Sequence, residues 1–381
     1  MLYISKMGGG LMQLVAYGAQ DVYLTGNPQI TFFKVVYRRH TNFSMESIRQ
    51  TFNGTVASGA KVTATISRNG DLIHRMYVQA GIKNADEAGV PVNAGHRLLK
   101  EVEVEIGGQK IDKHYSEWLD IWSELTVPAG KDTGYNLMVD VPKADATQTV
   151  YVPLQFWFCR NAGLALPLIA LQYHEVKVNI TFATDVMTAQ GAAIAQLQSA
   201  ALWVDYIYLD TDERRRFAQV SHEYLIEQLQ HTGAESASTN GQHRLNFNHP
   251  VKELVWVNHT AAAANWNDWT KVDTCKLQLN GHDRFAERDG SYFSLVQPYQ
   301  HHTNIPINTV GDGSANINVY SFALKPEDHQ PSGTCNMSRI DNATLNISIA
   351  AAVAGDVVRI YAVNYNVLRI MGGMGGLAYS N

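Results

Sequence analysis

The feature that most constrains the fold of this chain is an internal repeat of strand candidates. In the first half, an alternating stretch at Val102–Ile106 is followed by Gly107-Gly108 and another short strand candidate. The second half repeats this order at Leu277–Leu279 with Asn280-Gly281. Four further pairs follow in the same order: Met76–Gln79 and Leu254–Val257, Val152–Phe158 and Val319–Leu324, Val176–Ile180 and Leu345–Ile349, and Trp203–Tyr208 and Val358–Val363. Since loops absorb length differences at little cost, the repeat predicts two domains of one fold.

Each half contains about eight short strand candidates, in which apolar side chains tend to fall at every second position. Val102, Val104 and Ile106, for example, alternate with glutamates. Short antiparallel strands joined by long connections are typical of a two-sheet sandwich of the jelly-roll type. We therefore predict an all-β protein of two tandem eight-stranded antiparallel jelly rolls, with short helices in the loops.

The predicted domains are an N-terminal arm at 1–42, a first jelly roll at 43–210, a linker at 211–218 and a second jelly roll at 219–381. The arm is glycine-rich near its start and has no settled period, so it must be held by its own barrel or by a neighbour, or form a partly disordered tail over its first residues. The linker contains the arginine triplet Arg214–Arg216, which invites a nucleic-acid interpretation. The acids that precede the triplet favour a solvated linker instead.

Three local patterns make further predictions. Asn69-Gly70 lies between two β-type runs and predicts a hairpin, because both residues tolerate positive φ. Ser116 is the expected N-cap of a predicted helix with Trp118, Leu119, Trp122 and Leu125 on one face. The two tryptophans would form a lid over a barrel end or a stack against a ligand. The segment 126–149 is polar and without alternation, and predicts an irregular loop that would tolerate insertions near Gly134.

Composition excludes several classes of function. A net charge of −5 argues against a protein that coats nucleic acid electrostatically. The three cysteines (Cys159, Cys275, Cys335) are few and far apart, which favours buried thiols in a reducing compartment. No apolar run is long enough to span a bilayer, and the N-terminus does not resemble a secretory signal.

No catalytic constellation is found in the sequence. The glycine clusters lack the Lys-Ser/Thr of a phosphate loop, and no Gly-x-Ser-x-Gly elbow occurs. His301 and His302 are adjacent, so on a strand they would point to opposite faces and could not share a metal. Four other histidines near turns are predicted to be surface or capping groups: His96, His114, His231 and His243. We predict no catalytic, cofactor-binding or metal-binding residues, and a protein that is not an enzyme.

One stretch resembles a known family. The segment Ser321–Asn342, SFALKPEDHQPSGTCNMSRIDN, is similar to the second-domain signature of the major capsid proteins of nucleocytoplasmic large DNA viruses. Gly26–Lys34 with Tyr37–Phe43, and Tyr361–Ile370 near the C-terminus, resemble the same family. The resemblance implies a double jelly roll with a structural role in a capsid.

The resemblance also implies how such a protein assembles. Three copies would form a pseudo-hexagonal capsomer that tiles an icosahedral shell of a large double-stranded DNA virus. The expected partners are the chain itself, neighbouring capsomers and minor capsid proteins beneath the shell, with the arm against the inner capsid face and no direct contact with nucleic acid. The expected location is the virion, after assembly in the host cytoplasm.

Two alternatives stay open. The chain could be a minor or paralogous capsid component of the same fold. It could also be a carbohydrate-binding attachment protein, if Trp256, Trp266 and Trp269 form a stacking surface for sugar rings. The same tryptophans could instead cover a barrel end or fill an intersubunit contact.

Overall fold

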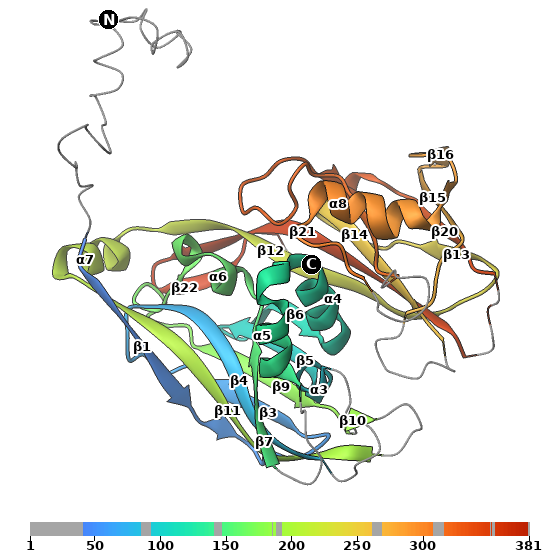
Figure 1. The fold of residues 1–381 in the computed structure, drawn as a ribbon. Coiled ribbons are helices and arrows are strands. Elements are labelled where there is room, and N and C mark those ends of the chain that lie inside the picture. The colour runs from blue at the N-terminus through green and yellow to red at the C-terminus, as the bar shows by residue number, and fades with distance from the viewer. Residues whose placement is uncertain are drawn as a thin grey trace, which may run out of the picture. The chain divides into compact units, whose positions relative to one another are not determined.

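Figure 1 shows the computed structural model of the protein, which describes residues 41–84, 93–140, 147–184, 186–187, 193–260, 269–307, 316–350, 352 and 355–379. The expectations for the N-terminal arm and for Trp266 lie outside these residues. The described jelly rolls belong to one compact unit, Ser44–Asn381.

Jelly roll 1 consists of two antiparallel sheets. The first has the order β1 (Phe43–Gln50), β11 (Ala193–Leu209), β4 (Leu72–Asn84) and β7 (Thr147–Pro153), with β8 (Leu166–Pro167) beside β4 and β10 (Val186–Met187) beside β11. The second has the order β2 (Phe52–Asn53), β3 (Lys61–Thr65), β9 (Val176–Phe182), β5 (Leu99–Ile106) and β6 (Gln109–Tyr115).

Jelly roll 2 repeats this arrangement. Its first sheet has the order β12 (His222–Ser236), β21 (Val357–Met371), β14 (Pro250–His259) and β18 (Asn318–Ser321), with β19 (Cys335–Asn336) beside β14 and β22 (Met374–Leu377) beside β21. Its second sheet has the order β13 (Asn240–Arg244), β20 (Ala343–Ser348), β15 (Thr274–Leu279) and β16 (His282–Asp283), with β17 (Arg288–Asp289) beside β15. The eight principal strands of the two rolls pair in one order, which confirms the predicted duplication and the predicted fold class.

Helices occupy the connections between strands. They are α3 (Ala94–Leu98), α4 (Ser116–Thr126), α5 (Ala129–Val139), α6 (Trp157–Arg160), the 3₁₀ turn η2 (Ala162–Leu164), α7 (Thr211–Gln219), the π-helical η3 (Tyr292–Val296), α8 (Gln297–His301) and the 3₁₀ turn η4 (Met337–Arg339). In roll 1, α4 and α5 connect the fifth and sixth principal strands, β6 and β7. In roll 2, η3 and α8 lie in the same connection, between β16 and β18.

Each roll has a core between its two sheets, and the roll 1 core also includes Ile226, Leu368 and Ile370 of roll 2. In roll 1, alternate residues of β4 such as Val78 and Ala80 pack inward against β5 and β9. In roll 2, Leu254 and Trp256 of β14 take the same role. The period of two that predicted the strands thus also gives the side chains that fill each sandwich.

The hairpin predicted at Asn69-Gly70 is wrong. The flanking strands β3 and β4 belong to opposite sheets of roll 1, so the chain crosses the sandwich there instead of turning back. Neither Asn69 nor Gly70 has a positive φ. Among the described residues, two-residue hairpin turns with positive φ occur at Gly107-Gly108 (57° and 85°), Asn280-Gly281 (51° and 79°) and Gly372-Gly373 (61° and 83°). A dipeptide signal cannot tell a return to the same sheet from a crossing to the facing one.

The irregular loop predicted at 126–149 is also wrong in its middle part, because α5 occupies Ala129–Val139. Among the residues of α5, only Val139 is buried, so the helix shows no apolar period that could reveal it in the sequence. Gly134 therefore lies inside a helix, and an insertion there would interrupt it. Residues 211–218, predicted as a linker, lie in α7, which has no buried residue.

Candidate functional site: the junction between the jelly rolls

Helix α4 belongs to roll 1 but packs on roll 2. Its residues Trp118, Ile121, Trp122 and Leu125 recur at helical spacing and therefore lie on one face. This face packs on the outer side of the first sheet of roll 2, against side chains of β14, β18 and β21: Val255, Val257, Val319, Tyr361 and Val363. Consequently β14 is buried on both sides, with Leu254 and Trp256 in the roll 2 core and its alternate residues under α4.

The predicted helix is thus confirmed, and its tryptophans are structural. The predicted N-cap is wrong, because Ser116 is the first helical residue and Tyr115 occupies the cap position. Leu119 does not share the tryptophan face, since it packs in the roll 1 core. The alternative of a ligand stack is wrong, because Trp118 is fully buried in protein and Trp122 is only 5% exposed. Trp256 and Trp269 are buried as well, so neither contributes to a sugar-stacking surface. The sequence does hold a sign of the covered face: Val255 and Val257 on the outer side of β14 are apolar, where a strand with one solvent-exposed face would have polar residues.

A single carboxylate anchors α4 to roll 2. Glu117 accepts hydrogen bonds from Trp269 Nε1 at 3.1 Å and Tyr361 Oη at 2.8 Å, and pairs with Arg359 Nη1 at 3.1 Å. Burial and the neighbouring Glu117 raise the pKa of Tyr361 well above its ordinary value. Because a buried charge is costly unless it is paired, this arrangement fixes the position of the first helical turn.

A second buried link joins α6 of roll 1 to roll 2. Arg160 Nη1 lies 2.7 Å from Glu227 Oε2, and Lys252 Nζ lies 2.8 Å from Glu227 Oε1. The Arg160 guanidinium also lies 3.9 Å from the centre of the Trp122 ring. The charged and apolar parts of the junction therefore meet at Trp122.

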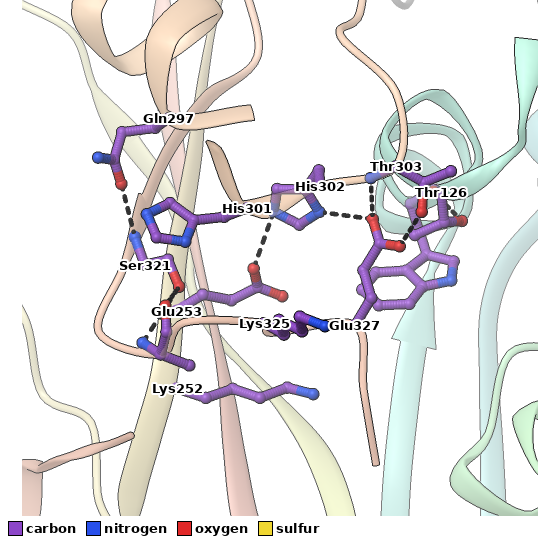
Figure 2. Close-up of polar contacts among 12 residues, drawn as sticks. Thr126, Lys252, Glu253, Gln297, His301, His302, Thr303, Ser321, Lys325 and Glu327 are labelled. Carbon is purple, nitrogen blue, oxygen red and sulfur yellow. Dashed lines mark hydrogen bonds and ion pairs between the residues drawn. The ribbon is translucent and has the colours of Figure 1, made fainter. Parts of the chain in front are cut away.

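Figure 2 shows a third polar group at the C-terminal end of α8. His302 lies between Glu253 and Glu327, with Nε2 at 3.1 Å from Glu253 and Nδ1 at 2.9 Å from Glu327. Burial opposes the protonation of His302, but the two carboxylates outweigh it and raise its pKa to about 9. Burial would likewise raise the pKa of Glu253, but His302 and the other nearby cations hold it below its ordinary value. The group is a carboxylate–imidazolium–carboxylate triad, of which Glu327 also accepts the Thr303 backbone N–H at 2.8 Å.

The predicted surface roles of three histidines are wrong. His96 is buried beside Asp120, His114 beside Asp112 and His243 beside Glu235. Asp120 and Glu235 lie in other elements than their histidines, whereas Asp112 lies in the same strand as His114, two residues before it. Position near a turn gave no indication of burial. The remaining one, His231, is partly buried and stacks on the Tyr361 ring.

No metal centre can be assigned within the described ranges, where no group of three or more His, Cys, Asp or Glu side chains is suitably placed. The predicted thiols are free, with Cys159 and Cys275 buried and Cys335 partly buried. Burial raises the pKa of the Cys159 thiol to about 12, which makes it a poor nucleophile. His301 and His302 point to different partners, since His301 Nδ1 bonds the Leu324 carbonyl.

A cleft of about 710 Å³ lies on the outer side of the first sheet of roll 1. It is lined by Tyr77 of β4, Tyr151 of β7 and Asp205 of β11, by Trp122 of α4, and by Glu327 of roll 2. Tyr77 stacks on Trp203 with ring centres 6.2 Å apart, and its ring centre lies 6.1 Å from that of Tyr151. This aromatic face is open in the single chain, whereas the corresponding face of roll 2 is covered by α4.

Two duplicated sandwiches with a buried junction define the class of protein by its fold: a double jelly-roll protein. The family model "Major capsid protein N-terminus" matches residues 31–210, and "Large eukaryotic DNA virus major capsid protein" matches residues 213–376. The chain belongs to the major capsid protein family of large eukaryotic DNA viruses.

Relatives and solved structures agree with this assignment. The chain is 63% identical to the major capsid protein of Pyramimonas orientalis virus, over 98% of this chain and 100% of that protein. It is 48% identical to the major capsid protein of Paramecium bursaria Chlorella virus 1, with the same coverage. The crystal structure of PBCV-1 VP54 matches with a TM-score of 0.82 and 43% identity, over 92% of this chain and all of that one. The Faustovirus major capsid protein, at 14% identity and a TM-score of 0.73 over 97% of this chain and 98% of that one, supports the fold alone.

The predicted family, the predicted structural role in a capsid and the prediction that the chain is not an enzyme are therefore confirmed. The chain is a structural component of the virion. None of the described helices is long and apolar enough to cross a membrane.

Proposed function

We propose that three copies of the chain assemble into a homotrimeric, pseudo-hexagonal capsomer that tiles an icosahedral shell of a large double-stranded DNA virus. The observation that carries this proposal is the pair of rolls with one strand order, held together by a buried junction. Three such chains around a threefold axis present six similar sandwiches, and a six-sided tile packs in a hexagonal lattice.

The domain division proposed for this role is an arm at 1–42, roll 1 at 43–210, a linker at 211–218 and roll 2 at 219–381. The two family models support a boundary near 211, since one ends at residue 210 and the other begins at 213. The exposed helix α7 at this position fits a connection that carries no core packing. We assign the arm to contacts with the inner capsid face, where minor capsid proteins would lie, and assembly to the host cytoplasm.

The major shell component is favoured over a minor or paralogous one by the 63% identity to a protein named major capsid protein. Capsomer function then depends on interfaces between copies, with no catalytic, cofactor or metal site required.

Light scattering coupled to gel filtration tests the proposal. Purified protein at micromolar concentration should have three times the chain mass, and negative-stain images should show six-sided particles. A monomer over the whole concentration range would contradict the proposal.

A further inference from the structure

Helix α4 lies in the connection between β6 and β7 of roll 1, and η3 and α8 lie in the equivalent connection of roll 2, between β16 and β18. The apolar residues of the two helical segments have the same spacing. In α4 the stripe is Trp118, Ile121, Trp122 and Leu125, all buried against roll 2. At the same relative positions, η3 and α8 have Tyr292, Leu295, Val296 and Tyr299. The residue after the first stripe position also corresponds: Leu119 enters the roll 1 core and Phe293 the roll 2 core.

The two stripes differ in what covers them. Leu295 is 38% exposed, Val296 39% and Tyr299 74%, whereas the three matching side chains of α4 are at most 5% exposed. Tyr292, which matches Trp118, is partly buried and packs against the roll 2 core, so the exposed part of the stripe is Leu295, Val296 and Tyr299. Leu324, whose carbonyl bonds His301 at the end of α8, is 74% exposed as well. A cluster of exposed apolar side chains on one short helical segment is typical of a contact surface.

The sheet face that α4 covers in roll 2 has an equivalent face in roll 1. In roll 2, α4 lies over Val255, which pairs with Tyr361 of β21 and Val319 of β18. In roll 1, the same position of the sheet is Tyr77, which pairs with Trp203 of β11 and Pro153 of β7. Tyr77 and Pro153 line the cleft of about 710 Å³, together with the exposed side chains of Met138 in α5 and Tyr151 in β7.

We propose that the helical segment Tyr292–His301 of one chain packs into this roll 1 cleft of a second copy, as α4 packs on roll 2 within the chain. The inference deepens the proposed homotrimer, on which it rests. The helix and the cleft are different surfaces of one chain, so the contact is head-to-tail, and a head-to-tail contact that closes forms a ring. Around the ring, roll 1 and roll 2 would alternate, with the junction within each chain and the contact between chains built on the same packing.

The helical segment is held rigidly enough to act as a preformed wedge. Gln297 accepts the Ser321 N–H at 3.1 Å, and the His302 triad fixes the end of α8 on roll 2 (Figure 2). Phe293 is fully buried in the roll 2 core. Little conformational entropy is then lost on docking, which favours association. The polar anchor is not repeated, because Ser291 occupies the position of Glu117 and bonds Asp289 instead. The contact between chains is therefore weaker and separable, while the junction within the chain is permanent.

Charge placed on either surface tests the inference. The variants Leu295→Asp and Tyr299→Asp alter the helix, Tyr151→Asp alters the cleft, and Val220→Asp is the matched control because Val220 is 55% exposed and lies on neither surface. We expect the wild type and the control to have three chain masses by light scattering, and the other three variants to have one. Far-ultraviolet circular dichroism should be the same for all, since each altered side chain is exposed in the single chain.

Trimeric helix and cleft variants beside a trimeric wild type would overturn the inference and leave the proposed function intact. A monomeric wild type would overturn the proposed function and the inference together.

Cross-linking supplies a second readout that does not require weakening the contact. With Tyr299→Cys and Tyr151→Cys in one chain, a short bismaleimide should give a denaturant-resistant product that ends at three chains, because each subunit links to two neighbours. Either substitution alone, and the wild type with its three native cysteines, should give no such product. A product that ends at two chains would indicate a twofold contact and overturn the inference.

Discussion

The outer faces of the first sheets of the two rolls occupy equivalent positions but have different surroundings. In roll 2 this face consists of valines and Tyr361 under the tryptophans of α4, and these side chains are buried. In roll 1 it carries Tyr77, Tyr151 and Trp203 and borders an open cleft. Because the two rolls share one fold, the packing of α4 on the roll 2 face indicates how a helix could pack on the equivalent, open face of roll 1. The covered face is a junction within the chain, and the open face is where a second copy would bind.

The largest expected effect is a difference in the free energy of unfolding between substitutions in the buried stripe of α4 and in the exposed stripe of η3 and α8. Replacing Trp118 with alanine should lower the free energy of unfolding by about 3–5 kcal/mol, because the side chain is fully buried and leaves a cavity under α4. Tyr299→Ala, at the exposed stripe, should cost less than about 0.5 kcal/mol in a single chain. Urea unfolding of each variant at low protein concentration measures both. Equal losses of unfolding free energy in the two variants would mean that both stripes have the same surroundings, which would contradict the comparison of the two faces.

The next effect concerns the His302 triad at the end of α8 and depends on pH. The pKa of His302 is raised to about 9 in the folded protein, so its stabilising contribution is complete below about pH 6.5 and is lost as the pH rises through 9. The loss should be on the order of 3 kcal/mol. Glu124 adds to the pH dependence, since burial and the nearby Asp120 and Asp132 raise its pKa to about 8.

Denaturant unfolding at a series of pH values measures this slope. His302→Gln should remove most of it, while the same substitution at the exposed His282 should leave it unchanged. A wild-type stability that stays constant from about pH 6.5 to 9 would show that the triad does not hold a charged imidazole.

A smaller effect tests whether the two rolls are equivalent at their hairpins. Gly281 has a φ of 79° and Gly108 a φ of 85°, and a Cβ atom at either would meet no atom within 4 Å. Valine at either position should therefore cost about 1–3 kcal/mol from backbone strain alone. Thermal unfolding of Gly281→Val and Gly108→Val should give similar losses. A loss at only one hairpin would mean that the turns differ in ways the strand order does not reveal.

The smallest effect tests helix α5, which follows α4 in roll 1. Gly134 lies inside α5, and a methyl group added at its Cα would meet no atom within 4 Å. Gly134→Ala should therefore raise the free energy of unfolding by about 0.4–1 kcal/mol. Helix content by circular dichroism should not fall. A destabilised variant would indicate that 129–139 is not helical in solution.

The strands were predictable from the sequence because burial on one side of a sheet imposes a period of two, as in Val102, Val104 and Ile106. The repeat of their order then identified the double jelly roll. The junction was not predictable in the same way. The stripe of Trp118 and Trp122 indicated a buried helix face but not which roll would cover it.

Other features depend on partners far along the chain. Buried histidines such as His96 and His302 have partners that only the tertiary structure brings near. The hairpin prediction at Asn69-Gly70 was wrong for a related reason, since the two flanking strands belong to opposite sheets. The sequence alone does indicate that the two helical segments correspond, because the apolar residues of Trp118–Leu125 and Tyr292–Tyr299 have the same spacing.

The most direct test of the contact between copies is a cryo-electron microscopy map of the purified assembly, reconstructed without imposed symmetry. We predict three subunits in a six-sided ring, with Tyr299 of each subunit in van der Waals contact with Tyr77 or Tyr151 of the next. A ring in which the roll 1 cleft faces solvent, or in which the segment Tyr292–His301 contacts no neighbouring chain, would contradict this prediction.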